Sequence, residues 1–249
     1  MTGRQDLFDE SMRLGHSAAW ELQWDRAIEF YRKALAEFPD DPTALSSLGL
    51  ALLETGQLKE SGAVYHHVAK ASPNDPVPVE KCAEVFERLG QISDAIEYRD
   101  RAAELHIRRR DVEKAVANWT QLARLAPDNL PVRSRLAVTY ERMGRRRDAV
   151  LEYVAVAALF QRARKVDRAT EAAQRALALI PGDPDASNAL RSLRQGKPLP
   201  PPAQPRGPAA VTAPLSPSRI QDFRGTEEEG RPQEEAADPE VAAQRQALA

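Results

Sequence analysis

The chain has 249 residues, with 35 Lys and Arg against 37 Asp and Glu and a net charge of −2. A balance this close to neutral argues against a protein that coats nucleic acid, which would be strongly basic. The single cysteine, Cys82, excludes an internal disulfide, so we expect a cytoplasmic protein kept in a reducing compartment. The N-terminus lacks the apolar stretch of a secretory signal, and no uncharged apolar run approaches the ~18 residues that span a bilayer.

Four segments of the body share one helical pattern. Each has a small residue, apolar residues four and seven positions later, and a proline five positions after that. This spacing puts the three side chains on one face of a helix, and the proline ends that helix. The acid or Asn after the proline can cap the next helix. The segments are 26–41, 61–76, 114–129 and 168–183.

A second pattern predicts where paired helices turn. The pattern is four residues long: an apolar residue, two polar residues and a small residue. The small residue that ends each copy lies at position 27, 61, 95, 115, 149 or 169. Successive copies are therefore 34, 34, 20, 34 and 20 residues apart. An interval of 34 holds two helices and a proline break, whereas 20 residues are too few for two helices of ~12 residues and a loop. Residues 93–109 and 147–162 are therefore each predicted to form one helix that serves two pairs.

These boundaries divide the body, residues 5–195, into four repeat units. Units 8–41 and 42–75 have two helices each, and units 76–129 and 130–183 have three. A short capping helix over 183–194 brings the expected number to eleven, since the end of a stacked-helix array needs a polar cap.

Several residue columns recur together in these units and resemble the tetratricopeptide repeat, which has a period of about 34 residues and two helices per unit. The second unit carries them most fully, at Leu45, Leu48, Gly49, Leu52, Gly56, Ser61, Tyr65, Val68 and Pro73. The resemblance implies an all-α, right-handed superhelical solenoid of antiparallel helix pairs. It also implies a non-catalytic scaffold or adaptor that binds a partner protein or peptide on its concave face.

In the resembled family, the first helices of the pairs line that concave groove. Leu50 and Leu53 suit an apolar anchor, and Trp20 and Val77 also face the groove. Three glutamates spaced i, i+4, i+7 form a carboxylate stripe that suits a basic ligand, although a plain solvated face is the favoured interpretation. The partner-binding candidates are Met12, His16, Ser46, Leu50, Leu53, Glu80, Glu84, Glu87, Ser134, Val138 and Glu141.

Basic runs at the predicted turns give a rival interpretation. If they gathered on one edge, they could make the chain a polyanion-binding or nucleic-acid-associated regulatory module. Neighbouring aspartates and the neutral body favour a solvated surface instead, so nucleic acid is not the expected partner. The candidate contacts are Arg108, Arg109, Arg110, Arg145, Arg146, Arg147, Arg162, Arg164 and Lys165. A further alternative is an accessory subunit whose partner carries the chemistry.

No arrangement of residues in the sequence predicts catalysis. The four histidines are scattered, and with one cysteine they do not supply the ligands of a zinc site. Phosphate-binding loops, nucleophile elbows and zinc-protease motifs are absent from the sequence. We therefore expect no enzyme activity, no cofactor, no metal and no membrane partner.

The last part of the chain, 196–249, has a different composition. It holds 10 of the 19 prolines and a strongly acidic stretch. Such a segment buries too little apolar surface to offset its ordering entropy, so it is predicted to be disordered. Residues 198–201 and 202–205 have the PxxP form of polyproline ligands, a match expected by chance in a segment so rich in proline.

Overall fold

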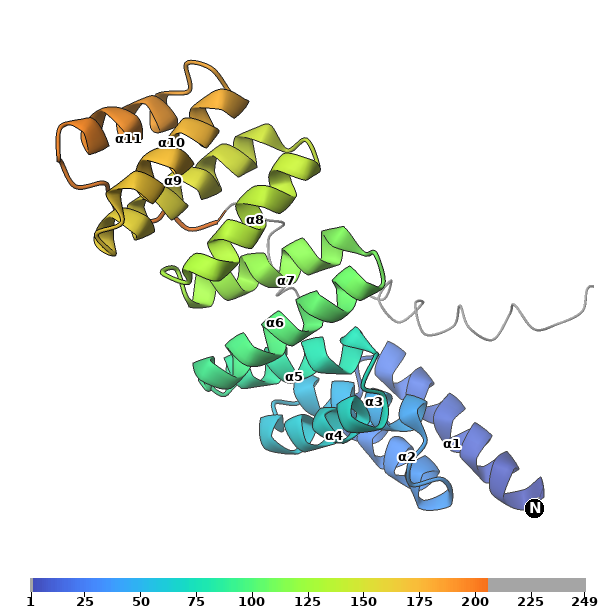
Figure 1. Ribbon diagram of the computed structural model, residues 1–249. Helices are drawn as coiled ribbons and strands as arrows, with labels where there is room; N and C mark the ends of the chain where they lie inside the picture. The colour runs from blue at the N-terminus through green and yellow to red at the C-terminus, as the bar shows by residue number, and fades with distance from the viewer. Residues whose placement is uncertain (1, 206–249) are drawn as a thin grey trace, which may run out of the picture. The chain divides into compact units, whose positions relative to one another are not determined.

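The computed structural model describes residues 2–205, which form eleven α-helices and, within that range, no β-strand. Figure 1 shows them following one another from α1 in blue to α11 in orange. This confirms the predicted all-α solenoid, while most of the predicted tail, 206–249, lies outside the described residues. The helices are Thr2–Trp20 (α1), Trp24–Glu37 (α2), Pro42–Glu54 (α3), Leu58–Ala71 (α4), Pro76–Arg88 (α5), Ile92–Arg108 (α6), Val112–Leu125 (α7), Leu130–Arg142 (α8), Arg146–Arg162 (α9), Val166–Leu179 (α10) and Pro184–Arg194 (α11).

The two short intervals of the sequence correspond to the long helices α6 and α9, of 17 residues each. Each packs against both the helix before it and the helix after it. Each is therefore unbroken and shared by two neighbours, as the spacing predicts.

Four helices begin at the caps that the sequence predicts. Asp41, Asp75, Asn129 and Asp183 precede α3, α5, α8 and α11, and each accepts a hydrogen bond from a backbone N–H of the first turn. At α3 the distance from the Ala44 nitrogen to Asp41 Oδ1 is 2.7 Å. A proline follows within the first two helical positions, where its missing N–H costs nothing.

The apolar core is divided among groups of consecutive helices. One cluster joins α1, α2 and α3, another joins α3, α4 and α5, and a third joins α6 to α9. Gly49 lets α3 and α4 approach closely, since a Cβ there would lie 2.9 Å from Cζ of Tyr65. The buried hydroxyl of Ser61 donates to the Gly49 carbonyl at 2.8 Å. Each helix thus buries its apolar face against its neighbours in sequence.

Three turns use residues that local sequence does not predict for them. Leu22, Arg110 and Arg164 have φ of 59°, 62° and 57°. Gly144 holds the corresponding place in the α8–α9 turn, at φ 73°. A left-handed conformation costs an L-residue roughly 1–2 kcal/mol and costs glycine little.

We expect Arg110→Gly to raise the free energy of unfolding by about 0.5–1 kcal/mol, because it relieves the left-handed strain. As the matched control, Gly144→Ala should lower it by about 1 kcal/mol, since the added Cβ meets no atom within 4 Å and only φ is penalised. Urea unfolding followed by circular dichroism measures both. A destabilising Arg110→Gly would contradict the turn geometry.

A buried ion pair connects α8 to α9. The side chains of Arg133 and Glu152 are 1% and 3% exposed, and Nη1 lies 3.1 and 3.0 Å from the two carboxylate oxygens. The guanidinium also donates through Nε to the Pro127 carbonyl at 3.3 Å. Burial raises the pKa of Glu152 despite the opposing charge of Arg133. A charge in such a place is tolerated only while its counter-charge is present.

Removing one member of this pair should therefore be more harmful than removing both. We expect Glu152→Leu to cost about 3 kcal/mol of unfolding free energy, because it leaves a guanidinium buried without its carboxylate. The double variant Arg133→Met/Glu152→Leu should recover at least half of that loss. The unfolding free energies of the two single variants and the double variant are measured by urea denaturation. If the loss in the double variant equalled the sum of the two single losses, the two residues would not be coupled.

Candidate functional site

Two of the predicted groove residues are not accessible to a partner. Leu53 is 0% exposed and packs with Tyr65 of α4 and Val85 of α5. Met12 is 7% exposed and belongs to the cluster of α1, α2 and α3. Contrary to the prediction, Leu53 cannot serve as a surface anchor, because the following two helices pack over it.

The other candidates on α1 and α3 are half-buried. His16 lies against Tyr31, with Nδ1 3.1 Å from the phenol oxygen. Ser46 and Leu50 are also half-buried on α3. Trp20, at the end of α1, is 47% exposed. Leu50 and Trp20 are thus the incompletely buried apolar side chains among the positions predicted for this end of the groove.

The carboxylate stripe of α5 is matched by cations of the same chain. Lys81 Nζ lies 2.8 Å from one oxygen of Glu84, and Arg88 lies 3.8 Å from the other. Burial alone would raise the pKa of Glu84, but Lys81, Arg88 and Arg99 together lower it. Glu87 accepts a 2.7 Å hydrogen bond from Arg99 of α6.

Glu80 belongs to a hydrogen-bonded network between α5, α6 and α7. One of its oxygens lies 2.8 Å from Nε2 of the buried His106 and 2.5 Å from the amide nitrogen of Asn118. The Asn118 oxygen accepts from Arg99 at 3.2 Å, which extends the network to Glu87. The stripe therefore binds neighbouring helices together, and it no longer favours a basic ligand.

The positions predicted on α8 differ among themselves. Val138 is 39% exposed, and Ser134 is half-buried. Glu141 accepts a 2.7 Å hydrogen bond from Tyr153 and is paired with Arg175 of α10. The hydrogen bond from Arg175 lowers the pKa of Glu141, whereas burial, with Glu141 beside it, raises the pKa of Tyr153 to about 12.

The three basic runs do not share one edge of the stack. Arg145 Nη1 lies 4.0 Å from Glu113 at the start of α7, which ties the α8–α9 turn to the α6–α7 turn. Arg162, in contrast, pairs at 3.0 Å with Asp128 in the α7–α8 loop. Helix α9 separates its two ends by roughly 25 Å at 1.5 Å per residue. The expected gathering on one edge therefore holds for 108–110 and 145–147 but not for 162–165.

Several of these cations already have carboxylate partners. Arg145 pairs with Asp148 at 2.9 Å and lies over the Tyr140 ring, and Arg147 pairs with Asp183 and Asp185. Within residues 2–205, no ion pair is described for five of the cations, which are exposed. They are Arg108, Arg110, Arg146, Arg164 and Lys165.

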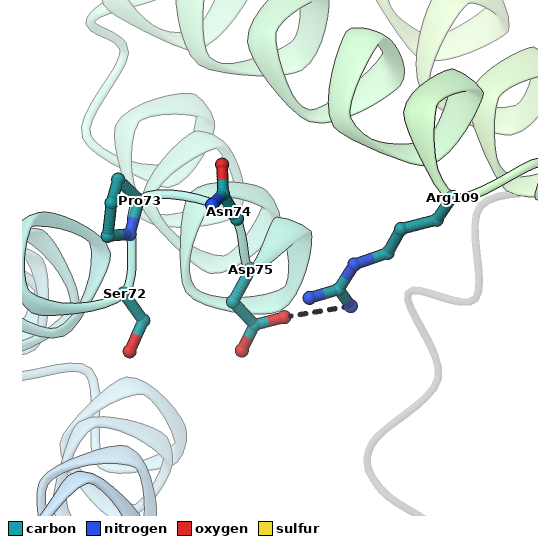
Figure 2. Close-up of a pocket in the computed structure, with 5 residues that line it drawn as sticks. All are labelled: Ser72, Pro73, Asn74, Asp75 and Arg109. Atoms are coloured by element: carbon teal, nitrogen blue, oxygen red, sulfur yellow. Dashed lines mark ion pairs between the residues drawn. The ribbon is translucent and has the colours of Figure 1, made fainter.

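Arg109 closes one side of an open polar hollow at the α4–α5 loop. Figure 2 shows its guanidinium reaching Asp75, at 3.3 Å. The remaining lining residues are Ser72, Pro73 and Asn74. The Asp75 carboxylate of the hollow is held in this ion pair with Arg109.

Residues 197–205, which composition assigns to the tail, contact the helices. They form neither helix nor strand. Gln161 of α9 donates through Nε2 to the Lys197 carbonyl and accepts from the Leu199 nitrogen, both at 2.7 Å. Arg133 Nη2 donates to the Ala203 carbonyl at 2.8 Å. Leu199 is 8% exposed within the apolar cluster of α8 to α11.

Other kinds of site receive no support from the described residues. Among residues 2–205, no group of three or more His, Cys, Asp or Glu is placed to hold a metal ion. Burial raises the pKa of the Cys82 thiol to about 12, which keeps it protonated and unreactive. In the same part of the chain, every helix is too short or too polar to cross a bilayer.

Comparisons with known proteins give these results. A family model for the tetratricopeptide repeat matches residues 21–79. Anaphase-promoting complex subunit 3 of Schizosaccharomyces pombe is 24% identical over 157 residues, which cover 57% of this chain and 24% of that protein. The chain thus spans about a quarter of the length of this curated relative.

Two solved structures from bacteria also resemble the chain. A thermophilic repeat protein of Thermus thermophilus has 20% identity and a TM-score of 0.35, with 76% of this chain and 99% of that one covered. PilF of Pseudomonas aeruginosa has 14% identity and a TM-score of 0.37, with coverage of 78% and 100%. The family match over 21–79, together with the recurring residue columns and the paired helices, shows that the chain contains tetratricopeptide repeats.

Proposed function

We propose that the chain is a non-catalytic scaffold that binds a partner protein or peptide along the first helices of its repeats. One observation carries the proposal: each of α1, α3, α5 and α8 presents an incompletely buried apolar side chain at a groove position. These are Trp20, Leu50, Val77 and Val138. Stacked helices align such positions along one surface, which suits a long ligand better than a small molecule.

The charges around these residues support a structural role for the groove carboxylates. Glu80, Glu84 and Glu87 are held by cations and amides of their own chain. Recognition would therefore depend mainly on apolar anchors, of which tryptophan is the strongest common type. The curated relative is by its name a subunit of a complex. A repeat protein in a complex commonly binds other subunits, which agrees with the proposed scaffold role.

The polyanion alternative has less support. Several of its cations are paired with carboxylates, and the runs lie at opposite ends of α9. Splitting and neutralising the positive charge weakens the field that would attract a polyanion. An accessory subunit of an enzyme complex is compatible with the scaffold role, and the buried Cys82 suits a cytoplasmic location.

Placing carboxylates at two groove anchors should abolish partner capture. We expect the double variant Leu50→Glu/Val77→Glu to reduce recovery of bound proteins at least about tenfold, because one lost anchor is worth ~1–2 kcal/mol. The measurement is affinity capture from native cells, with the recovered proteins quantified by mass spectrometry.

The matched control puts the same charges outside the groove. Ile92 and Val166 are 40% and 50% exposed at the starts of α6 and α10, where an acid suits the helix dipole. The double variant Ile92→Glu/Val166→Glu should capture the same proteins as the wild type. If all three chains keep their helical circular dichroism and recover equal amounts, the groove is not the binding surface.

A further inference from the structure

We propose that α8, α9 and α11 form a docking site for an extended peptide with a Pro-Leu-Pro core, which residues 197–205 occupy within the same chain. A partner peptide of this chemistry would bind by displacing that segment. The site lies apart from the anchors Leu50 and Val77, so it does not depend on the groove function proposed above.

Gln161 recognises the backbone of the segment at two points. Its amide nitrogen donates to the Lys197 carbonyl and its oxygen accepts from the Leu199 N–H, both at 2.7 Å. One side chain thus spans residues i and i+2, while Pro198 between them has no N–H to satisfy. This contact accepts any residue in the middle position but excludes proline at the third.

Arg133 supplies a second, more deeply buried contact. Its side chain is 1% exposed, Nη1 donates to Glu152, and Nε donates to the Pro127 carbonyl. Nη2 donates to the Ala203 carbonyl at 2.8 Å. A buried guanidinium donor that lost its acceptor would pay a desolvation penalty. A peptide carbonyl at this position satisfies Nη2 while the segment covers it.

Leu199 provides the selective side-chain contact. It is 8% exposed and belongs to the buried apolar cluster that includes Val156 of α9 and Leu190 and Leu193 of α11. Hydrogen bonds to backbone give affinity without sequence preference, and a pocket for one apolar side chain gives the preference. A peptide with an acid in place of this leucine would put a charge among three aliphatic side chains.

The prolines fix the distance between these contacts. Residues 200–202 are all proline, and a polyproline II helix rises ~3.1 Å per residue, so Leu199 and Ala203 would lie about 12 Å apart. Neighbouring helices are separated by roughly 8–10 Å, so a rigid spacer of this length can cross from α9 to α8. A rigid peptide also loses little entropy on binding.

The segment is held lightly enough to be exchanged. Only Leu199 and Pro205 are buried, and six of the nine residues from 197 to 205 are exposed. Its advantage over a free peptide is its attachment to α11, which gives an effective concentration on the order of mM. Weakening one anchor of the segment should therefore open the site to a peptide added in solution.

A competition experiment on the full chain tests this. The probe is a fluorescent peptide of the sequence GKPLPPPAQPR, residues 196–206, and its binding is followed by anisotropy. We expect Leu199→Asp to increase the affinity of the chain for this peptide at least tenfold over wild type. Gln204→Asp adds the same charge at an exposed position of the segment and should leave the affinity at the wild-type value.

A site variant and a size measurement complete the test. Adding Gln161→Ala to Leu199→Asp should lower the peptide affinity at least fivefold while helical circular dichroism is unchanged. Equal peptide binding by wild type and Leu199→Asp, absence of binding to both, or no effect of Gln161→Ala would each overturn the proposal. So would conversion of a dimer to a monomer by Leu199→Asp, because the segment would then come from a second copy.

Discussion

An amphipathic helix cannot bury its own apolar stripe, and in this chain the stripes are buried mainly against helices one or two places away in sequence. The close approach of α3 and α4 at Gly49, fastened by Ser61, shows how little space separates the members of a pair. In the described part of the chain, the core is divided among groups of neighbouring helices. Stacking the helices in this way produces a long surface, and a long surface suits a scaffold that binds a partner protein.

Polar side chains in this stack work mostly between helices. The network of Glu80, His106 and Asn118 ties α5 to α6 and α7, and the pair of Arg133 and Glu152 ties α8 to α9. Charges used in this way are only partly available to a partner. The apolar side chains left exposed on the first helices, and the surface that holds 197–205, are therefore the better candidates for recognition.

Much of the fold can be predicted from local sequence because its determinants are local. The caps, the helix-ending prolines and the unbroken helices α6 and α9 each follow from a few adjacent residues. Residue preference does not predict the left-handed turns at Arg110 and Arg164, because arginine stands there in place of the glycine that such helix-ending hydrogen bonds favour. The prediction for the candidate site was less accurate. Leu53 lies at a groove position by periodicity, but α4 and α5 cover it.

The remaining differences come from residues distant in sequence. Asn118, which donates a hydrogen bond to Glu80, lies 38 residues after it in the sequence, so no pattern within α5 predicts the contact. Composition likewise averages over the whole tail and cannot detect that one leucine, Leu199, joins the buried apolar cluster of α9, α10 and α11. Both depend on which surfaces the stack brings together.

Amide hydrogen exchange on a shortened chain measures directly whether the stability of each helix depends only on the helices near it in sequence. Cutting after residue 129 divides the chain between α7 and α8, where consecutive helices touch least. If support is only local, the amides of α1 to α5 in the fragment 1–129 will keep the protection they have in the full chain, within about threefold, while α7 loses its own. Loss of protection throughout the fragment would mean that the helices form one indivisible core, and the central claim would be wrong.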